Sequence, residues 1–262
     1  MSYPPSSWLR YLPAPMRARI EHRPNLQKAL TNTGWLFGDK ILRMGVGLFV
    51  GAWIARHLGP TDYGALGYAL ALVAIFQTAA TLGLDNISIR DMSRPGSQPE
   101  VILGTLSRLR VGSAIIAGLC ASITILLPES HESGRATALL LVCCLPFYAV
   151  DIIDLRFQSR LESRYTVLAK GTAFIVGAIL KIFLLITGAP LTAFALAILF
   201  EVSIGGLALG YAYKLKRIDA NWEWNRTLAV KMLAEGFPIF LAGIALTLYT
   251  HNLRRHHGFP HP

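Results

Sequence analysis

The chain has 262 residues, of which 53% are hydrophobic and only 15% are charged, and its formal net charge is +10. Soluble domains usually carry about 25% charged residues, so this composition, with a mean hydropathy of +0.46, excludes an ordinary soluble protein. It indicates a chain that crosses a bilayer several times. Nucleic-acid binding is not expected, because the cations are spread over loops instead of lining one soluble face.

Residues 1–32 are expected to form a cytoplasmic arm, which is interrupted by five prolines. Seven apolar stretches follow, and a helix needs about 20 such residues to cross the hydrocarbon. They predict an all-α, polytopic transmembrane helix bundle of six full spans and a short seventh. The expected spans are Trp35–Ala55, Gly64–Leu84, Val111–Leu127, Ala136–Val150, Thr166–Gly188, Leu191–Tyr213 and Gly236–Thr250.

These spans divide the chain into parts. Residues 33–213 are expected to form a first six-helix lobe, 214–235 a cytoplasmic loop and 236–250 a partial seventh span. Residues 251–262 read as an aberrant or truncated tail, because four of the seven histidines fall there and the composition changes abruptly. A frame-shifted or truncated product is the expectation for this tail, with a metal-binding tail as the alternative.

Lysine and arginine occupy every second gap between the spans. Before the tail, eighteen cations lie in alternate gaps and only two in the gaps between them. Loops that remain in the cytoplasm hold an excess of such residues. The pattern therefore predicts a multi-pass membrane protein with a cytoplasmic N-terminus.

Charged residues also lie inside the expected spans, where a charge costs about 2.5–3.5 kcal/mol even on the insertion scale. Asp39 and Arg43 are four residues apart on one helix, so they share a face and can pair. Lys40 points elsewhere. Lys181 and Glu201 lie on consecutive antiparallel spans, which makes them natural partners.

Two interpretations of these charges stay open at the level of sequence. Asp39 and Arg43 can be a paired cluster whose arginine reaches the surface, or part of a cationic lining for an anionic headgroup. Lys181 and Glu201 can be a structural pair or a site of cation or proton coupling. No metal site, cofactor or catalytic residue is expected. Asp151 and Asp154 are expected to pair with Arg156 or Arg160, with a magnesium site as the minor alternative.

Small residues one turn apart suggest close helix packing within the bilayer. They occur at Gly34 and Gly38, at Gly47 and Gly51, and at Gly206 and Gly210. Pro146 is expected to kink the fourth span, since proline removes a helical hydrogen bond.

Several motifs resemble those of a known family, the polysaccharide (O-antigen type) flippases of the multidrug/oligosaccharidyl-lipid/polysaccharide exporter superfamily. The resemblance covers about Thr33 to Tyr249. It is carried by Leu-Gly-Pro-Thr-Asp-Tyr-Gly at 58–64, Gly-Leu-Asp-Asn-Ile-Ser-Ile-Arg at 83–90, Phe-Gln-Ser-Arg at 157–160 with Tyr165, and Gly-Phe-Pro at 236–238.

The resemblance implies the N-terminal lobe of a two-lobed carrier that moves undecaprenyl-diphosphate-linked oligosaccharide across the bacterial inner (plasma) membrane for surface polysaccharide assembly. Membrane lipids and a second lobe or partner chain are the implied partners. Lys40 and Arg43 are the expected contacts for the diphosphate, with Asp39 orienting Arg43 and with Lys181 and Glu201 stabilising the lobe or coupling it to an ion.

Three other functions remain as alternatives. A proton- or cation-coupled drug antiporter of the same superfamily would use Glu201, the acidic residue deepest in a span. A membrane protein without transport activity is compatible with a truncated chain. A membrane enzyme acting on lipid-linked sugars is not expected, because the longest outward loop, about 128–135, is too short to hold a catalytic site.

Overall fold

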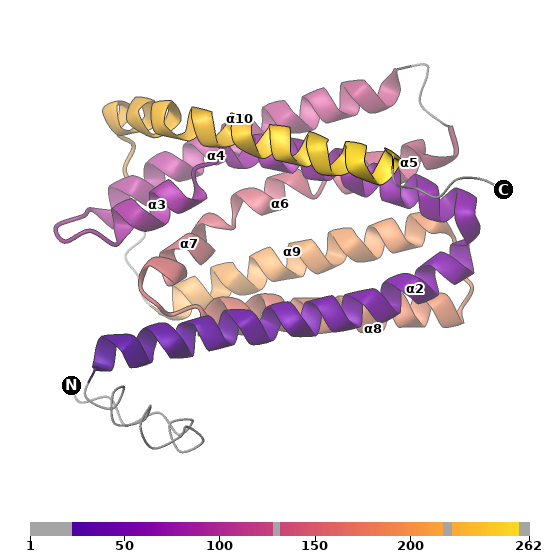
Figure 1. Cartoon of the computed structure of the whole chain (residues 1–262), viewed down its shortest axis with the longest axis horizontal. Helices are drawn as coiled ribbons and strands as arrows, with labels where there is room; N and C mark the ends of the chain where they lie inside the picture. The colour runs from indigo at the N-terminus through magenta and orange to yellow at the C-terminus, as the bar shows by residue number, and fades with distance from the viewer. Residues whose placement is uncertain (1–22, 128–131, 217–221, 257–262) are drawn as a thin grey trace.

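The structure is a computed structural model, and it describes residues 23–127, 132–216 and 222–256. Most of the expected arm, at 1–22, and the last part of the expected tail, at 257–262, lie outside these residues. The described residues form helices with no strand among them, so the predicted all-α transmembrane bundle is confirmed. Figure 1 shows these helices running roughly parallel and antiparallel to one another along the length of the molecule.

Helix α2 (Pro24–Thr81) is a hairpin of two arms, 24–58 and 60–81, which run in opposite directions (Figure 1). Gly59 divides them with φ 74° and ψ 177°, a backbone conformation that is open almost only to glycine. Pro60 then starts the second arm, where its missing N–H costs no hydrogen bond. The Leu-Gly-Pro motif therefore makes the turn between the first two expected spans.

Helix α3 (Asp85–Met92) is short, and α4 (Pro99–Leu126) is longer than the third expected span. The apolar side chains of Ile102, Leu103 and Leu106 are buried, so they hold the first turns of α4 in the core.

The fourth span is broken into α5 (Glu132–Val142), α6 (Leu145–Ala149) and α7 (Ile152–Ser159). The first break, at Cys143 and Cys144, directly precedes Pro146, as expected from the loss of a backbone donor at proline. The expected kink is confirmed, and a second bend at Val150 and Asp151 separates α6 from α7.

Helices α8 (Arg164–Ile186) and α9 (Leu191–Leu215) pack against each other as an antiparallel pair. Gly188, with φ 68°, makes the turn between them, and Pro190 caps α9. The His57 Nε2 donates a hydrogen bond of 3.1 Å to the backbone oxygen of Ala189, so this turn and the Gly59 turn lie at the same end of the bundle.

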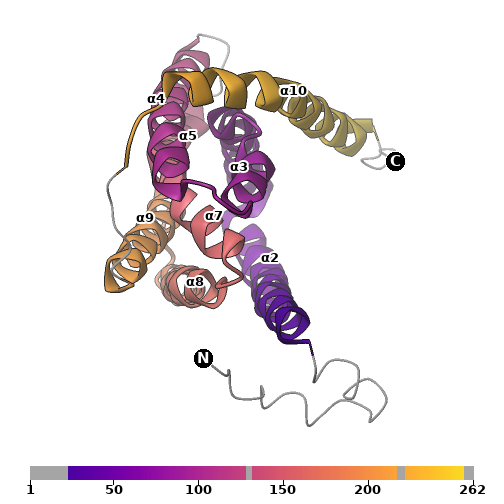
Figure 2. The same cartoon turned by 90° about the vertical axis from the view of Figure 1, so that its left-hand side faces the viewer.

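Helix α10 (Arg226–His256) begins ten residues before the expected seventh span and diverges from the rest of the bundle (Figure 2). It meets the turn after α2 through two glycines. A Cβ on Gly236 would lie 2.8 Å from the oxygen of Leu82, and one on Gly83 would lie 2.9 Å from the nitrogen of Phe240. The two backbones therefore touch without intervening side chains.

Many large apolar side chains are exposed, as is required of a surface in contact with lipid. Phe49 is 74% exposed and Ile186 is 80% exposed. Within the residues that the structure describes, five helical stretches are long and apolar enough to cross a membrane, and they are Leu26–Met92, Pro99–Leu126, Gly134–Ser159, Arg164–Ile186 and Leu191–Leu215. The first of these contains both arms of α2.

The expected close packing at the first two glycine pairs is wrong. Apart from the backbone of its own helix and its chain neighbours, no atom would lie within 4 Å of a Cβ placed on Gly34, Gly38, Gly47 or Gly51. These positions therefore face open space. The bundle makes its tight glycine contacts elsewhere, because the α2 hairpin and the broken fourth span determine which helix faces meet.

Candidate functional site

Asp39 and Arg43 form an ion pair on the first arm of α2, with 2.8 Å between Oδ2 and Nε. The pairing expected from their spacing is confirmed. The Arg43 guanidinium also lies over the ring of Phe174 on α8, 5.0 Å from its centroid. Its buried Nη2 has no hydrogen-bond partner among the described residues. Lys40 is exposed and takes no part in this pair.

Lys181 and Glu201 join α8 to α9 through an ion pair of 2.7 Å between Nζ and Oε2. The two side chains are only 15% and 17% exposed, and their expected pairing is confirmed. Gly177, one turn before Lys181, makes room for the carboxylate, because a Cβ there would lie 2.5 Å from Glu201 Oε2.

Lys170 is a member of the site that was not expected from the sequence. Its Nζ lies 2.9 Å from an oxygen of Asp151 and 3.1 Å from an oxygen of Asp154. The expectation that these carboxylates pair with Arg156 or Arg160 is wrong, because the bend at Val150 and Asp151 turns them toward α8. The ammonium group occupies the position between them that a magnesium ion would need.

These charges gather around a pocket of about 260 Å³ between α2, α6, α8 and α9. We call the seven residues Asp39, Arg43, Asp151, Asp154, Lys170, Lys181 and Glu201 the ionic cluster. Four of them line the pocket directly, together with Tyr148 and small residues of α9, and the four are Arg43, Asp151, Lys170 and Glu201.

The ionic cluster contains four carboxylates and three cations, and every cation is paired. A cationic cavity was expected from the resemblance, whereas the cluster holds one more carboxylate than it holds cations. Each of these charged groups is tolerated inside a span because it has a partner of opposite charge. A buried charge without such a partner would strongly destabilise the fold. An anion entering the pocket would therefore compete with carboxylates for Arg43 and Lys170.

Arg110 is buried on α4 and pairs with Asp85, at the first residue of α3. Arg110 directly precedes the third expected span, and its side chain is only 2% exposed. Because α4 begins at Pro99, Arg110 lies within this helix instead of in an irregular loop.

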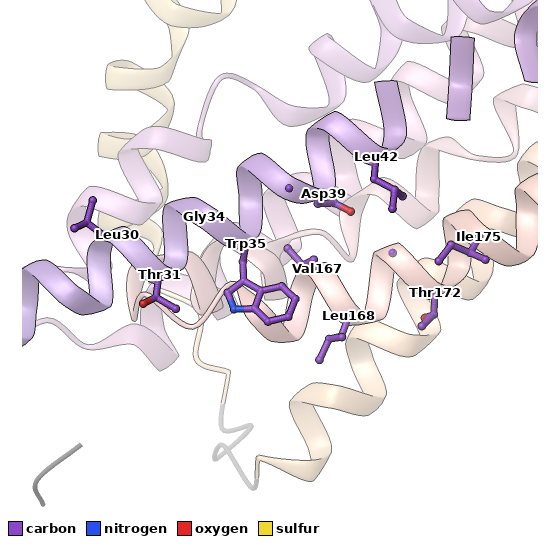
Figure 3. A pocket seen from close by; sticks show the side chains of 12 residues that line it. Leu30, Thr31, Gly34, Trp35, Asp39, Leu42, Val167, Leu168, Thr172 and Ile175 are labelled. Carbon is purple, nitrogen blue, oxygen red and sulfur yellow. The ribbon is translucent and has the colours of Figure 1, made fainter. Parts of the chain in front are cut away.

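A second cavity is an apolar groove of about 660 Å³ between the first arm of α2 and α8, which we call the α2–α8 groove. Asp39 is the charged residue in its lining. Figure 3 shows Trp35 reaching from α2 toward Val167 and Leu168 on α8. Asp39 lines the groove and Arg43 lines the pocket of the ionic cluster, so the two cavities lie on either side of the Asp39–Arg43 pair.

The sequence matches the family described as polysaccharide biosynthesis protein over residues 29–252. A search of curated proteins returned no significant match. Among solved structures, the chain resembles the outward-facing conformation of a multidrug resistance MATE family transporter of the MOP superfamily. The TM-score is 0.61 at 16% identity, which shows a shared fold, and the match covers 87% of this chain.

The same match covers 55% of the transporter, so the chain spans about half the length of that structure. The fold expected from the sequence motifs, that of a helical lobe in this superfamily, agrees with this likeness. With most of its length matched by one family, the chain belongs to the polysaccharide biosynthesis protein family.

Proposed function

We propose that the chain is the first lobe of a carrier that moves undecaprenyl-diphosphate-linked oligosaccharide across the bacterial inner membrane for surface polysaccharide assembly. The observation that carries this proposal is the family match over 29–252 of a chain built from helices that can span a membrane. Such a carrier moves cargo without chemical conversion, so no catalytic residue or cofactor is assigned.

The ionic cluster supplies the polar contacts in this proposal. Arg43 offers a guanidinium nitrogen without a hydrogen-bond partner among the described residues, and guanidinium groups bind phosphate oxygens in pairs of hydrogen bonds. Asp39 holds Arg43 in place. Lys40, exposed on the same helix, would approach the diphosphate from outside the pocket. Lys181 and Glu201 keep α8 and α9 together.

A carrier of this kind works by moving one lobe against another around a central site. The proposal therefore requires a second lobe, in the same polypeptide or in a partner chain. Membrane lipids surround both lobes, and the N-terminus is placed in the cytoplasm on the basis of the cations in alternate loops.

The test is transport of a fluorescent lipid-linked oligosaccharide in vesicles that contain the chain with its second lobe. We expect Arg43→Gln with Lys40→Gln to lower the initial rate about tenfold or more, because hydrogen bonds to charged groups contribute about 1.5–3 kcal/mol. The control is Arg226→Gln, which removes an exposed cation on α10 and should leave the transport rate unchanged. An unchanged rate in the double variant would refute the assigned roles, and no transport by the wild type would refute the proposal.

A second candidate is a proton- or cation-coupled drug antiporter, which is favoured by the fold shared with a multidrug transporter and by Glu201 within a span. In that case Glu201→Gln abolishes drug efflux driven by an ion gradient, while the fluorescent oligosaccharide is not moved. If neither cargo moves, a membrane protein without transport activity is the remaining function.

A further inference from the structure

The end of the bundle where α7, α8 and α9 meet carries a group of cations around one tyrosine. The Arg164 guanidinium lies 4.7 Å from the centroid of the Tyr165 ring and donates a hydrogen bond of 2.7 Å to its hydroxyl. Lys216, at the end of α9, holds its Nζ 4.2 Å from the same centroid. We call Arg164, Tyr165 and Lys216 the tyrosine site.

The cations of the tyrosine site differ from those of the ionic cluster. Arg43, Lys170 and Lys181 are each paired with a carboxylate, whereas no carboxylate of the described ranges forms an ion pair with Arg164 or Lys216. Both cations are exposed, and Arg160 adds a third at the end of α7. Glu162 is the acidic residue of the adjoining turn, so the local charge remains positive.

The ring of Tyr165 gives these cations a defined arrangement. It packs against Phe157 at 5.6 Å between centroids, and Phe157 is fully buried. The turn before α8 is fixed as well, because the Ser163 N–H donates to Asn32 Oδ1 on α2 at 2.7 Å. The anchored ring therefore holds both cations at this end of the bundle through cation–ring attraction.

The α2–α8 groove continues from the tyrosine site. Leu168 lies four residues after Arg164, so the two share a face of α8 about 6 Å apart along its axis. Leu168 lines the groove, and the α8 side of the lining extends to Ile175. Trp35 and Leu168 are 42% and 53% exposed, so the groove is open at the surface of this helix bundle.

We propose that the tyrosine site binds the phosphate of an anionic phospholipid, with one acyl chain lying in the α2–α8 groove. Charge complementarity selects the headgroup, since the site is cationic while the groove beyond it is apolar. The cationic loops are those expected on the cytoplasmic side, whose leaflet holds anionic lipids. This inference does not depend on which cargo the protein carries.

Fluorescence of Trp35 reports directly on a chain in the groove. The test uses a variant that keeps Trp35 and replaces Trp8, Trp53, Trp222 and Trp224 by phenylalanine, placed in phosphatidylcholine nanodiscs. A small fraction of lipid carries brominated acyl chains on either phosphatidylglycerol or phosphatidylcholine. We expect brominated phosphatidylglycerol to quench Trp35 at a mole fraction about tenfold lower than brominated phosphatidylcholine requires, because each cation attracts anionic lipid.

A matched pair of double variants separates this site from general attraction to a basic surface. Arg164→Gln with Lys216→Gln should reduce the preference for phosphatidylglycerol to about twofold or less. Arg226→Gln with Lys231→Gln removes the same charge from the start of α10 and should leave the preference intact. Equal quenching by both lipids in the parent variant, or equal losses in the two double variants, overturns the proposal.

Two further measurements identify the ligand. Unlabelled undecaprenyl diphosphate should displace the brominated lipid no better than unlabelled phosphatidylglycerol does. Stronger displacement would assign the site to the cargo and would contradict the proposal that its ligand is a phospholipid. Native mass spectrometry of the wild-type chain, which does not rely on the tryptophan replacements, should show bound phosphatidylglycerol that is lost in the Arg164→Gln, Lys216→Gln variant. Retention of the lipid there contradicts the site.

Discussion

Gly177 allows a carboxylate to enter the interface between α8 and α9. Replacing it by alanine places a methyl group against Glu201 and should destabilise the protein by about 1–3 kcal/mol, as overpacking does in other cores. The measurement is thermal unfolding in detergent. Gly210→Ala on α9 is the control, because a Cβ there has no atom within 4 Å. Equal effects of the two substitutions would contradict a specific clash with Glu201.

The Lys181–Glu201 pair should behave as two buried charges that depend on each other. Lys181→Met leaves Glu201 uncompensated and should cost about 3–5 kcal/mol of the free energy of unfolding. Adding Glu201→Gln to that variant removes the orphaned charge and should recover most of the loss. A double variant no more stable than Lys181→Met would show that the two residues do not act as a pair.

At the scale of residues, the sequence predicted contacts that depend on one helix or on two consecutive helices. Asp39 and Arg43 are related by helical spacing alone, and Lys181 and Glu201 by a short turn between antiparallel spans. Lys170 could not be assigned to its carboxylates in this way. Its contact depends on a bend at Asp151, which the local sequence does not specify.

The hairpin of α2 depends on the conformation of a single residue. Gly59→Ala should destabilise the protein by about 1–3 kcal/mol, because a side chain is strained at its positive φ. Thermal unfolding of this variant is compared with that of Gly64→Ala, a position inside the second arm with open space around it. If the two variants unfold alike, the turn does not require glycine.

Helix α10 is linked to α3 by an ion pair of 2.6 Å between Arg90 and Glu235. Arg90 also forms an ion pair of 3.0 Å with Asp91 on α3, so its guanidinium connects α10 to α3. Spin labels on α3 and α10 should show a broader distance distribution in Arg90→Glu, and the exchange Arg90→Glu with Glu235→Arg should narrow it again. Failure of the exchange to narrow the distribution would exclude a direct role of this pair.

At the scale of elements, hydropathy and turn residues located the helices well. The Leu-Gly-Pro motif marked the α2 turn, and Gly188 with Pro190 marked the turn between α8 and α9. Hydropathy failed at helix ends that continue beyond the apolar stretch. Residues 99–110 of α4 and 226–235 of α10 are helical because they pack on neighbouring helices, which is information that a hydropathy count does not contain.

For the whole molecule, the alternation of cations predicts which ends of the bundle face the cytoplasm. In a variant without the native Cys120, Cys143 and Cys144, Gln98→Cys in the turn before α4 should react with a membrane-impermeant maleimide only from the cytoplasmic side. Thr187→Cys, at the end of α8, should react only from outside. Labelling of both positions from the same side would reject the predicted threading.

The broken fourth span constrains how the lobe can associate with other helices. Leu141, Cys144 and Leu145 around its first break are almost completely buried, and half of its apolar window is enclosed by protein. Non-helical backbone at this depth cannot face hydrocarbon, because its amide and carbonyl groups would lose hydrogen bonds. This span must therefore keep its contacts with α2, α4 and α9, and companion helices would dock on exposed apolar faces away from its first break.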